Sequence, residues 1–170
     1  LDDDGLNDFN FFNESFTTTV FYGDLANVKA LFVGAFDTML NGIAGSTGFL
    51  SGGGGYTYYR PYIIQDGEII GGAFNFYNNN YQTLAMEIDE FSSPFPPTHN
   101  GNWYYFYGGE VIEKFLGISF TDEDNIKRYG WIRCSVIDSG RTLIIHDYAY
   151  ELQPNYPLIA GDTVRYVALT

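Results

Sequence analysis

The sequence predicts an all-β protein, built as an antiparallel β-sandwich or a jelly-roll-like fold. Three observations lead to this prediction. About nine or ten short apolar runs follow one another, loops rich in Gly, Pro and Asn separate them, and no segment shows a secure helical period. We expect a single domain over residues 1–170, because a chain of this length can bury one substantial core.

The strongest strand signal is a hairpin at residues 128–151. Its first run alternates Tyr129 and Trp131 with smaller or aliphatic residues, which is the period of a strand. Asp138, Ser139 and Gly140 supply the turn, since Gly140 can adopt a positive φ. Because aromatic and β-branched residues fill both runs, we expect this hairpin in the middle of a sheet.

The N-terminal part alternates strand signals with irregular segments. Residues 9–22 are rich in Phe and Thr and predict two strands around a polar break at residues 13–15. Residues 28–36 favour a buried strand over the short helix that residues 26–40 could also hold. The glycine-rich residues 41–55 predict a flexible loop.

The middle of the chain is dense in aromatic residues. In residues 56–62, Pro61 confines a tyrosine-rich segment to a sheet edge or to an irregular conformation. Residues 63–70 form two short runs around an Asp-Gly pair and predict a hairpin. Residues 75–81 predict an Asn-rich loop.

Three further strands are expected toward the C-terminus. Residues 83–91 alternate apolar and polar side chains and predict a half-buried strand. Residues 92–102 contain three prolines and predict a long irregular loop. Strands are also predicted at residues 114–121 and 163–169, and residues 122–125 predict an acidic turn before the hairpin.

The charge balance limits the classes of partner. The net charge is −13, with only eight Lys and Arg residues. Nucleic acid and anionic membrane surfaces both require basic side chains, so we expect neither as a partner. No run approaches the roughly 20 apolar residues of a membrane span. The acid excess instead suits an environment rich in divalent cations.

The first eight residues carry an acidic motif, D-x-D-G-x-x-D. Calcium loops place carboxylates at alternate positions and a glycine at the sharp turn, as Gly5 would be here. The twelfth loop position would be Phe11, which cannot bind a cation, so this is not an EF-hand. We expect either a short calcium loop or a solvated acidic segment. The calcium ligands would be Asp2, Asp4, the carbonyl of Leu6, and Asp8.

The chain has more aromatic residues than one sandwich core should hold. It contains 15 Tyr, 15 Phe and 2 Trp. Tyrosine has an apolar face and a polar tip and is enriched at interfaces, so we expect some tyrosines to face outward. Such rings can stack on sugars or pack against another protein. The expected contact residues are Tyr56, Tyr58, Tyr59, Tyr62, Trp103, Tyr104, Tyr105 and Tyr107.

Several motifs together resemble a group of secreted bacterial surface proteins. These are the D-x-D-G-x-x-D-F opening, a G-x-W segment at residues 101–103 followed by F-L-G-I-S-F at residues 115–120, Y-G-W-I-R at residues 129–133, and D-Y-A-Y-E at residues 147–151. Proteins of this group usually carry a C-terminal sorting tail, of the PEP-CTERM or the type IX secretion type. The resemblance implies an exported, surface-attached or released protein without an established catalytic activity.

The residues themselves also favour a non-catalytic role. The two histidines are not spaced as a metal pair, and neither H-E-x-x-H nor G-x-S-x-G is present. A glycan hydrolase would need two carboxylates at a set separation, and the alternative is that these acids are surface groups. The acids that could supply the pair are Glu87, Asp89, Glu90, Glu110 and Glu113.

Two smaller groups have a structural and a functional interpretation. His146, Asp147 and Glu151 could bind a cation together, but hydrogen bonds to a turn or a neighbouring loop are the expected role. Cys134 alternates with Ile132 and Val136, so we expect a buried small hydrophobic residue rather than a reactive thiol.

The sequence therefore predicts a non-catalytic extracellular structural or adhesive module. It would bind copies of itself or other surface proteins and assemble into a filament or sheath. A carbohydrate-binding module is the alternative, with Trp103, Tyr104 and Tyr105 as a sugar platform. A glycan hydrolase is a more distant alternative.

Overall fold

The computed structural model describes residues 8–19, 24–36, 41–50, 56–78, 81–91, 93–105, 109–122 and 125–162. All the regular structure in these residues is β-strand. The strands are β1 (Phe9–Thr19), β2 (Leu25–Ala35), β3 (Gly42–Leu50), β4 (Tyr56–Pro61), β5 (Ile69–Ile70), β6 (Phe76–Tyr77), β7 (Gln82–Glu90), β8 (Thr98–Asn100), β9 (Tyr104–Tyr105), β10 (Gly109–Thr121), β11 (Lys127–Ile137), β12 (Thr142–Tyr150) and β13 (Leu158–Ile159).

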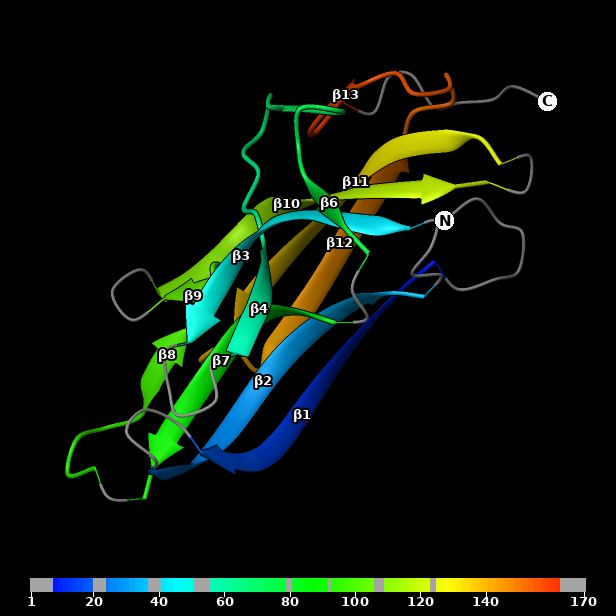
Figure 1. Cartoon of the computed structure of the whole chain (residues 1–170). Helices are drawn as coiled ribbons and strands as arrows, with labels where there is room; N and C mark the ends of the chain where they lie inside the picture. Colours follow the sequence, from blue (N-terminus) through cyan, green and yellow to red (C-terminus); the bar gives the residue numbers. More distant parts are fainter. Residues whose placement is uncertain are drawn as a thin grey trace.

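The strands form two large antiparallel sheets and one small one. The first has four strands in the order β1-β2-β7-β8, and the second has seven, ordered β12-β11-β10-β3-β4 with β6 paired to β3 and β9 paired to β10. A two-stranded sheet of β13 and β5 lies beyond the seven-stranded sheet, with β13 above β10 and β11 in Figure 1. This arrangement confirms the predicted all-β sandwich.

The main core lies between the two large sheets. Alternation on β11 turns Ile132, Cys134 and Val136 inward, where they meet Leu31 of β2 and Leu84 of β7. Cys134 is fully buried, as predicted, and burial raises the pKa of its thiol to about 12. The thiol therefore stays protonated and acts as a small apolar side chain.

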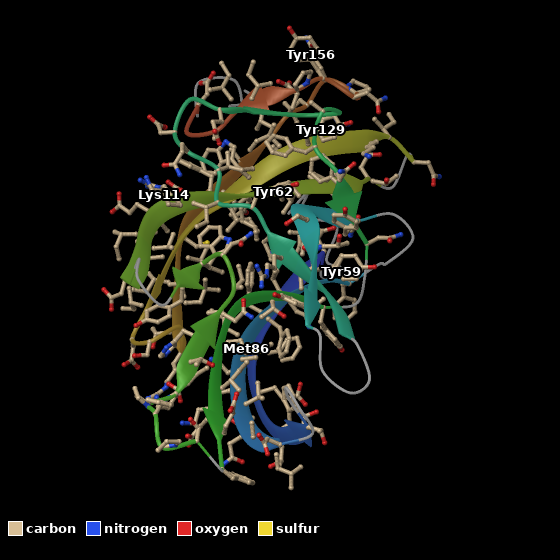
Figure 2. The ribbon with its side chains drawn as sticks, turned by 60° about the vertical axis from the view of Figure 1, so that its left-hand side comes forward. Tyr59, Tyr62, Met86, Lys114, Tyr129 and Tyr156 are labelled. Carbon is tan, nitrogen blue, oxygen red and sulfur yellow. The ribbon has the colours of Figure 1, made fainter. Side chains whose placement is uncertain are left out.

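A second cluster covers the opposite face of the seven-stranded sheet. Tyr129 and Trp131 point to this side of β11 and pack with Phe115 under Ile70 and Leu158 of the small sheet. Figure 2 shows the difference between Tyr129, which lies below this layer, and Tyr156, which points away from it. The small sheet therefore serves as a lid on the outer face.

The predicted hairpin is formed by β11 and β12, but it lies at the edge of its sheet. Asp138, Ser139 and Gly140 all adopt positive φ, at 53°, 57° and 78°. In the part of the chain that the structure describes, β12 is the outermost strand of the seven-stranded sheet, so the expectation of a central hairpin is wrong. Strand order depends on distant pairings, which local composition does not report.

The tip of this hairpin contacts the four-stranded sheet. A Cβ on Gly140 would lie 2.7 Å from the Cβ of Ala85 on β7. Next to it, the carbonyl of Arg141 accepts a hydrogen bond of 3.0 Å from Asn13 Nδ2 of β1. The tip therefore joins the two sheets, and Gly140 is needed both for its φ and for this close approach.

Most of the glycine-rich segment is not a loop. Gly42–Leu50 forms β3, which pairs with β10, β6 and β4. Its glycines permit close contact, since a Cβ on Gly45 would lie 2.5 Å from the carbonyl oxygen of Arg60. The prediction of a loop over residues 41–55 is therefore wrong for β3, and residues 51–55 lie outside the described residues.

Pairing with β2 also corrects two predictions about its neighbours. β1 is one continuous strand, because eleven of its residues pair with β2 in unbroken register through the polar residues 13–15. β7 is buried from Gln82 to Ile88 rather than half-buried. One of its faces meets the main core, and the other presents Met86 to Val28 and Ala30 of β2.

The remaining predictions were met in part. The segment at residues 28–36 is a strand, and β4 is an edge strand as Pro61 required. The Asp-Gly pair makes a turn, with Glu68 N bonded to Gln65 O at 3.2 Å, but its flanks pair with Phe115 and β13 instead of with each other. The expected loops at residues 75–81 and 92–102 contain the short strands β6 and β8.

The acidic turn at residues 122–125 closes through a hydrogen bond of 2.9 Å from Asn125 N to Asp122 O. The strand expected at residues 163–169 lies outside the described residues.

Replacing Gly140 with alanine should destabilise the fold strongly. The new Cβ adds left-handed backbone strain and overlaps Ala85, so we expect a loss of about 3 kcal/mol in the free energy of unfolding. Urea denaturation measures the loss. Gly67→Ala is the matched control, since Gly67 has φ 82° with no atom near its Cβ, and should cost about 1 kcal/mol. Equal losses would show that the hairpin tip does not press on β7.

Candidate functional site

The most unusual polar group in the described residues is Glu87 of β7, whose carboxylate is 8 % exposed. Lys29 Nζ lies 3.0 Å from Oε1, and Arg141 Nη2 lies 3.2 Å from Oε1 and 2.9 Å from Oε2. His99 Nε2 lies 3.6 Å from Oε2. These four residues are called the Glu87 cluster below.

The sheet register explains how the cluster forms. Lys29 of β2 and His99 of β8 are the two cross-strand partners of Glu87, so three side chains lie in one row across the four-stranded sheet. Arg141 reaches the same row from the tip of the β11–β12 hairpin. The cluster therefore contains groups from both sheets.

Two cations, Lys29 and Arg141, face the single carboxylate of the cluster. Burial acts to raise the pKa of Glu87, but hydrogen bonds and charge from Lys29 and Arg141 outweigh it and hold this pKa below its ordinary value. The hydrogen bond to Glu87 in turn raises the pKa of Arg141. Glu87 is therefore ionised, and both of its oxygens accept hydrogen bonds from cations.

A shallow hollow of about 210 Å³ adjoins the cluster on the same face of the sheet. Its polar lining comes from three strands and includes Ser15, Thr17, Asn27 and Asp89. The hydroxyl of Thr17 donates to Asn27 Oδ1 at 3.1 Å. The hollow thus places hydroxyl, amide and carboxylate groups side by side, which is suited to a ligand that carries hydroxyl groups.

Of the other candidate hydrolase acids, Glu110 and Glu113 lie apart from Glu87 and have structural contacts, whereas Asp89 shares its hollow. Glu110 and Glu113 are on β10, in the other sheet. Glu110 Oε1 accepts a hydrogen bond of 3.0 Å from the backbone N–H of Asp138. Glu113 Oε2 lies 3.6 Å from Arg133 Nη1. Asp89 lines the hollow, and Glu90 ends β7.

His146, Asp147 and Glu151 each have a separate partner. Asp147 forms a two-fold hydrogen bond with Arg133, at 2.9 and 2.7 Å, and His146 Nε2 lies 2.8 Å from Ser135 Oγ. Glu151 Oε1 accepts from the N–H of Gln153 at 3.0 Å. Within the described part of the chain, no three His, Cys, Asp or Glu side chains are grouped to hold a metal ion.

The calcium loop can be followed only at its end. Asp2, Asp4 and Leu6 lie outside the described residues. Asp8 Oδ1 lies 3.4 Å from Asn41 Nδ2, next to the start of β3. Calcium binding at these four residues stays a prediction.

The structure corrects the proposed sugar platform. Trp103 is fully buried in the main core, and its backbone N–H donates a hydrogen bond of 3.0 Å to the carbonyl of Leu84. Tyr104 packs against His99, with ring centroids 4.9 Å apart. The side chain of Tyr105 and all of Tyr107 lie outside what the structure describes. A run of five aromatic residues is thus partly core, because backbone pairing with β7 draws Trp103 inward.

The other expected contact tyrosines are half-buried. Tyr58 donates to Asn100 Oδ1 at 3.4 Å, Tyr59 packs on Tyr77, and Tyr62 packs on Phe74. Tyr59 and Tyr62 are labelled in Figure 2. The side chain of Tyr56 lies outside what the structure describes. These rings support the β3–β4 region and its neighbours rather than standing free.

Exposed apolar side chains occur on β12 instead. Ile144, Ile145 and Tyr148 are 40 %, 49 % and 54 % exposed. The sequence signal was the run Leu143, Ile144 and Ile145, which breaks strict alternation. This run predicts a central strand, whereas the structure shows an edge strand with a bulge opposite Arg133 and Cys134.

Glu87→Gln should reduce stability at neutral pH and flatten its pH dependence. The pKa of Glu87 is depressed in the fold, so its contribution is present above the ordinary value of 4.5 and is lost as pH falls below it. We expect a loss of about 1–2 kcal/mol at pH 7, because Lys29 and Arg141 are half-exposed and can be hydrated. Denaturant unfolding from about pH 7 to about pH 3 measures the difference, which should shrink on acidification.

Glu90→Gln on the same strand controls for the loss of one negative charge. A gap between wild type and Glu87→Gln that stays constant down to the lowest pH would contradict the ion pairing.

Among the described residues, no helix is long and apolar enough to cross a membrane. Comparison of the chain with models of known families, with curated proteins and with solved structures finds no match. The resemblance to secreted bacterial surface proteins therefore stays an expectation from the sequence motifs.

Proposed function

We propose that this protein is a non-catalytic structural or adhesive module outside the cell, which associates with copies of itself or with other surface proteins. One observation carries the proposal. Among the described strands, β12 ends the seven-stranded sheet as a nine-residue edge strand, and Ile144, Ile145 and Tyr148 on it are exposed. A long apolar edge strand readily pairs with a strand of another chain.

The charge distribution supports association at this edge. The chain carries a net charge of −13, which makes copies repel one another. Asp147 is the one acid within β12, and it is neutralised by the two-fold hydrogen bond to Arg133. β12 is thus a locally neutral strand on an acidic molecule. Calcium bound at Asp2, Asp4, Leu6 and Asp8 would reduce the repulsion further.

The Glu87 cluster supports a structural use of this buried acid. Lys29 binds Oε1 from the same sheet, and Arg141 binds both carboxylate oxygens from the other sheet. A general acid or base must instead be able to exchange a proton with a substrate. The location outside the cell rests on the sequence motifs.

The purified protein should self-associate in a concentration-dependent way. Sedimentation velocity from micromolar to millimolar concentration, with calcium and with chelator, should show dimers or larger species, more of them with calcium. A strict monomer at the highest concentration with calcium would contradict the proposal.

A second candidate function, glycan binding, is favoured by the hollow beside the Glu87 cluster. Asp89, Asn27 and Thr17 there could bond sugar hydroxyls. Glycan-array screening followed by calorimetry should find a ligand whose binding is weakened at least about tenfold by Asp89→Ala. Glu90→Ala is the matched control, because neighbouring strand residues face opposite sides. An array without hits, or equal effects of both variants, would rule out this site.

A further inference from the structure

We propose that two copies of the chain pair their β12 strands antiparallel about a two-fold axis, with Ile145 of each copy opposite Tyr148 of the other. The axis passes between His146 and Asp147. This inference rests on the proposed self-association and specifies its interface. The two seven-stranded sheets would become one continuous sheet across the dimer.

The bulge in β12 determines which side chains share a face. Ile145 pairs with Cys134 and Tyr148 pairs with Ile132, and both partners point into the main core. Ile145 and Tyr148 therefore lie on the core side of the sheet although they are three residues apart. Both remain about half-exposed, so that face of β12 is not fully covered within the described structure.

The residues between them lie on the opposite side. Asp147 bonds to Arg133 and His146 to Ser135, and the side chains of Arg133 and Ser135 point away from the main core. Farther out, Ala149 packs with the outer cluster, and Leu143 packs against the core. From residue 143 to 150 the side chains thus point in, out, in, out, out, in, out, in.

The order of inward and outward side chains over residues 143–150 is the same in both chain directions. An antiparallel pair requires that opposed residues lie on the same face of the sheet. With the axis between His146 and Asp147, this holds for every pair from Leu143 with Tyr150 to His146 with Asp147. The bulge interrupts the alternation of side-chain direction at the axis. A shift of the β12–β12 register by one residue would therefore pair core-side residues with outward-pointing residues.

The chemistry of the opposed pairs is also compatible. Ile145 against Tyr148 is an aromatic and β-branched pair, which stabilises adjacent strands, and it occurs twice. At the axis, the imidazole of His146 lies opposite the carboxylate of Asp147, so no like charges face each other. A second copy of the chain therefore fits this edge in shape and charge, which is why we choose it over an unrelated peptide strand.

Ile145→Lys tests the interface, because it places a charge on each side of the axis within the apolar pair. We expect the dimer dissociation constant, measured by sedimentation equilibrium, to rise at least about tenfold. Ile159→Lys on β13 is the matched control, since Ile159 is similarly exposed and lies on the small sheet. Its dissociation constant should equal that of wild type. Tyr148→Ser gives an independent test if Ile145→Lys fails to fold.

The register is tested by disulfide formation. The disulfide variants carry Cys134→Ala, because Cys134 lies opposite residue 145 in the same chain and could trap its new thiol. In this background, Ile145→Cys with Tyr148→Cys should form covalent dimers on oxidation, since opposed residues in antiparallel strands have the Cα separation that a disulfide needs. Ile144→Cys with Tyr148→Cys, whose side chains lie on opposite faces, should not. Association that is insensitive to Ile145→Lys and Tyr148→Ser would overturn this interface and leave the proposed function standing. A wild-type protein that is always monomeric would overturn both.

Discussion

The contact between the hairpin tip and the four-stranded sheet is the constraint on which the rest of the structure depends. Arg141 brings a guanidinium from one sheet to the Glu87 carboxylate of the other, and Gly140 lets the backbone approach β7 closely. A buried carboxylate is costly unless cations and hydrogen bonds compensate it. The pairing of Glu87 with Arg141 therefore holds the hairpin tip against the four-stranded sheet.

The β11–β12 hairpin has a tip that packs on the four-stranded sheet and an exposed outer edge along β12. Its tip contacts β1 and β7, while the outer edge of β12 carries exposed isoleucine and tyrosine side chains. The bulge near His146 changes which face these side chains occupy. The tip thus joins the two sheets, and the edge carries the surface that we propose for self-association.

The aromatic side chains that exceed the capacity of one sandwich core do not mainly face outward, as the sequence analysis expects. Much of it is internal, as with Trp103 and Trp131, or half-buried in ring contacts such as that of Tyr59 with Tyr77. Three layers of β-structure offer more interior than one sandwich interface, so they accommodate more rings. The surface available to a partner is mixed, with Tyr148 beside aliphatic side chains, and this favours strand pairing over sugar stacking at that edge.

The sequence by itself determined the fold class, several strands, the turn at residues 138–140 and the burial of Cys134. These follow from local alternation and from residues that tolerate positive φ. It did not determine that β3 is a strand, that Trp103 is buried, or that β12 is an edge. Those outcomes, and the Glu87 cluster, depend on pairing between residues far apart in the chain. Only the tertiary structure decided them, because the neighbours of a strand, rather than its own residues, set which faces and edges are covered.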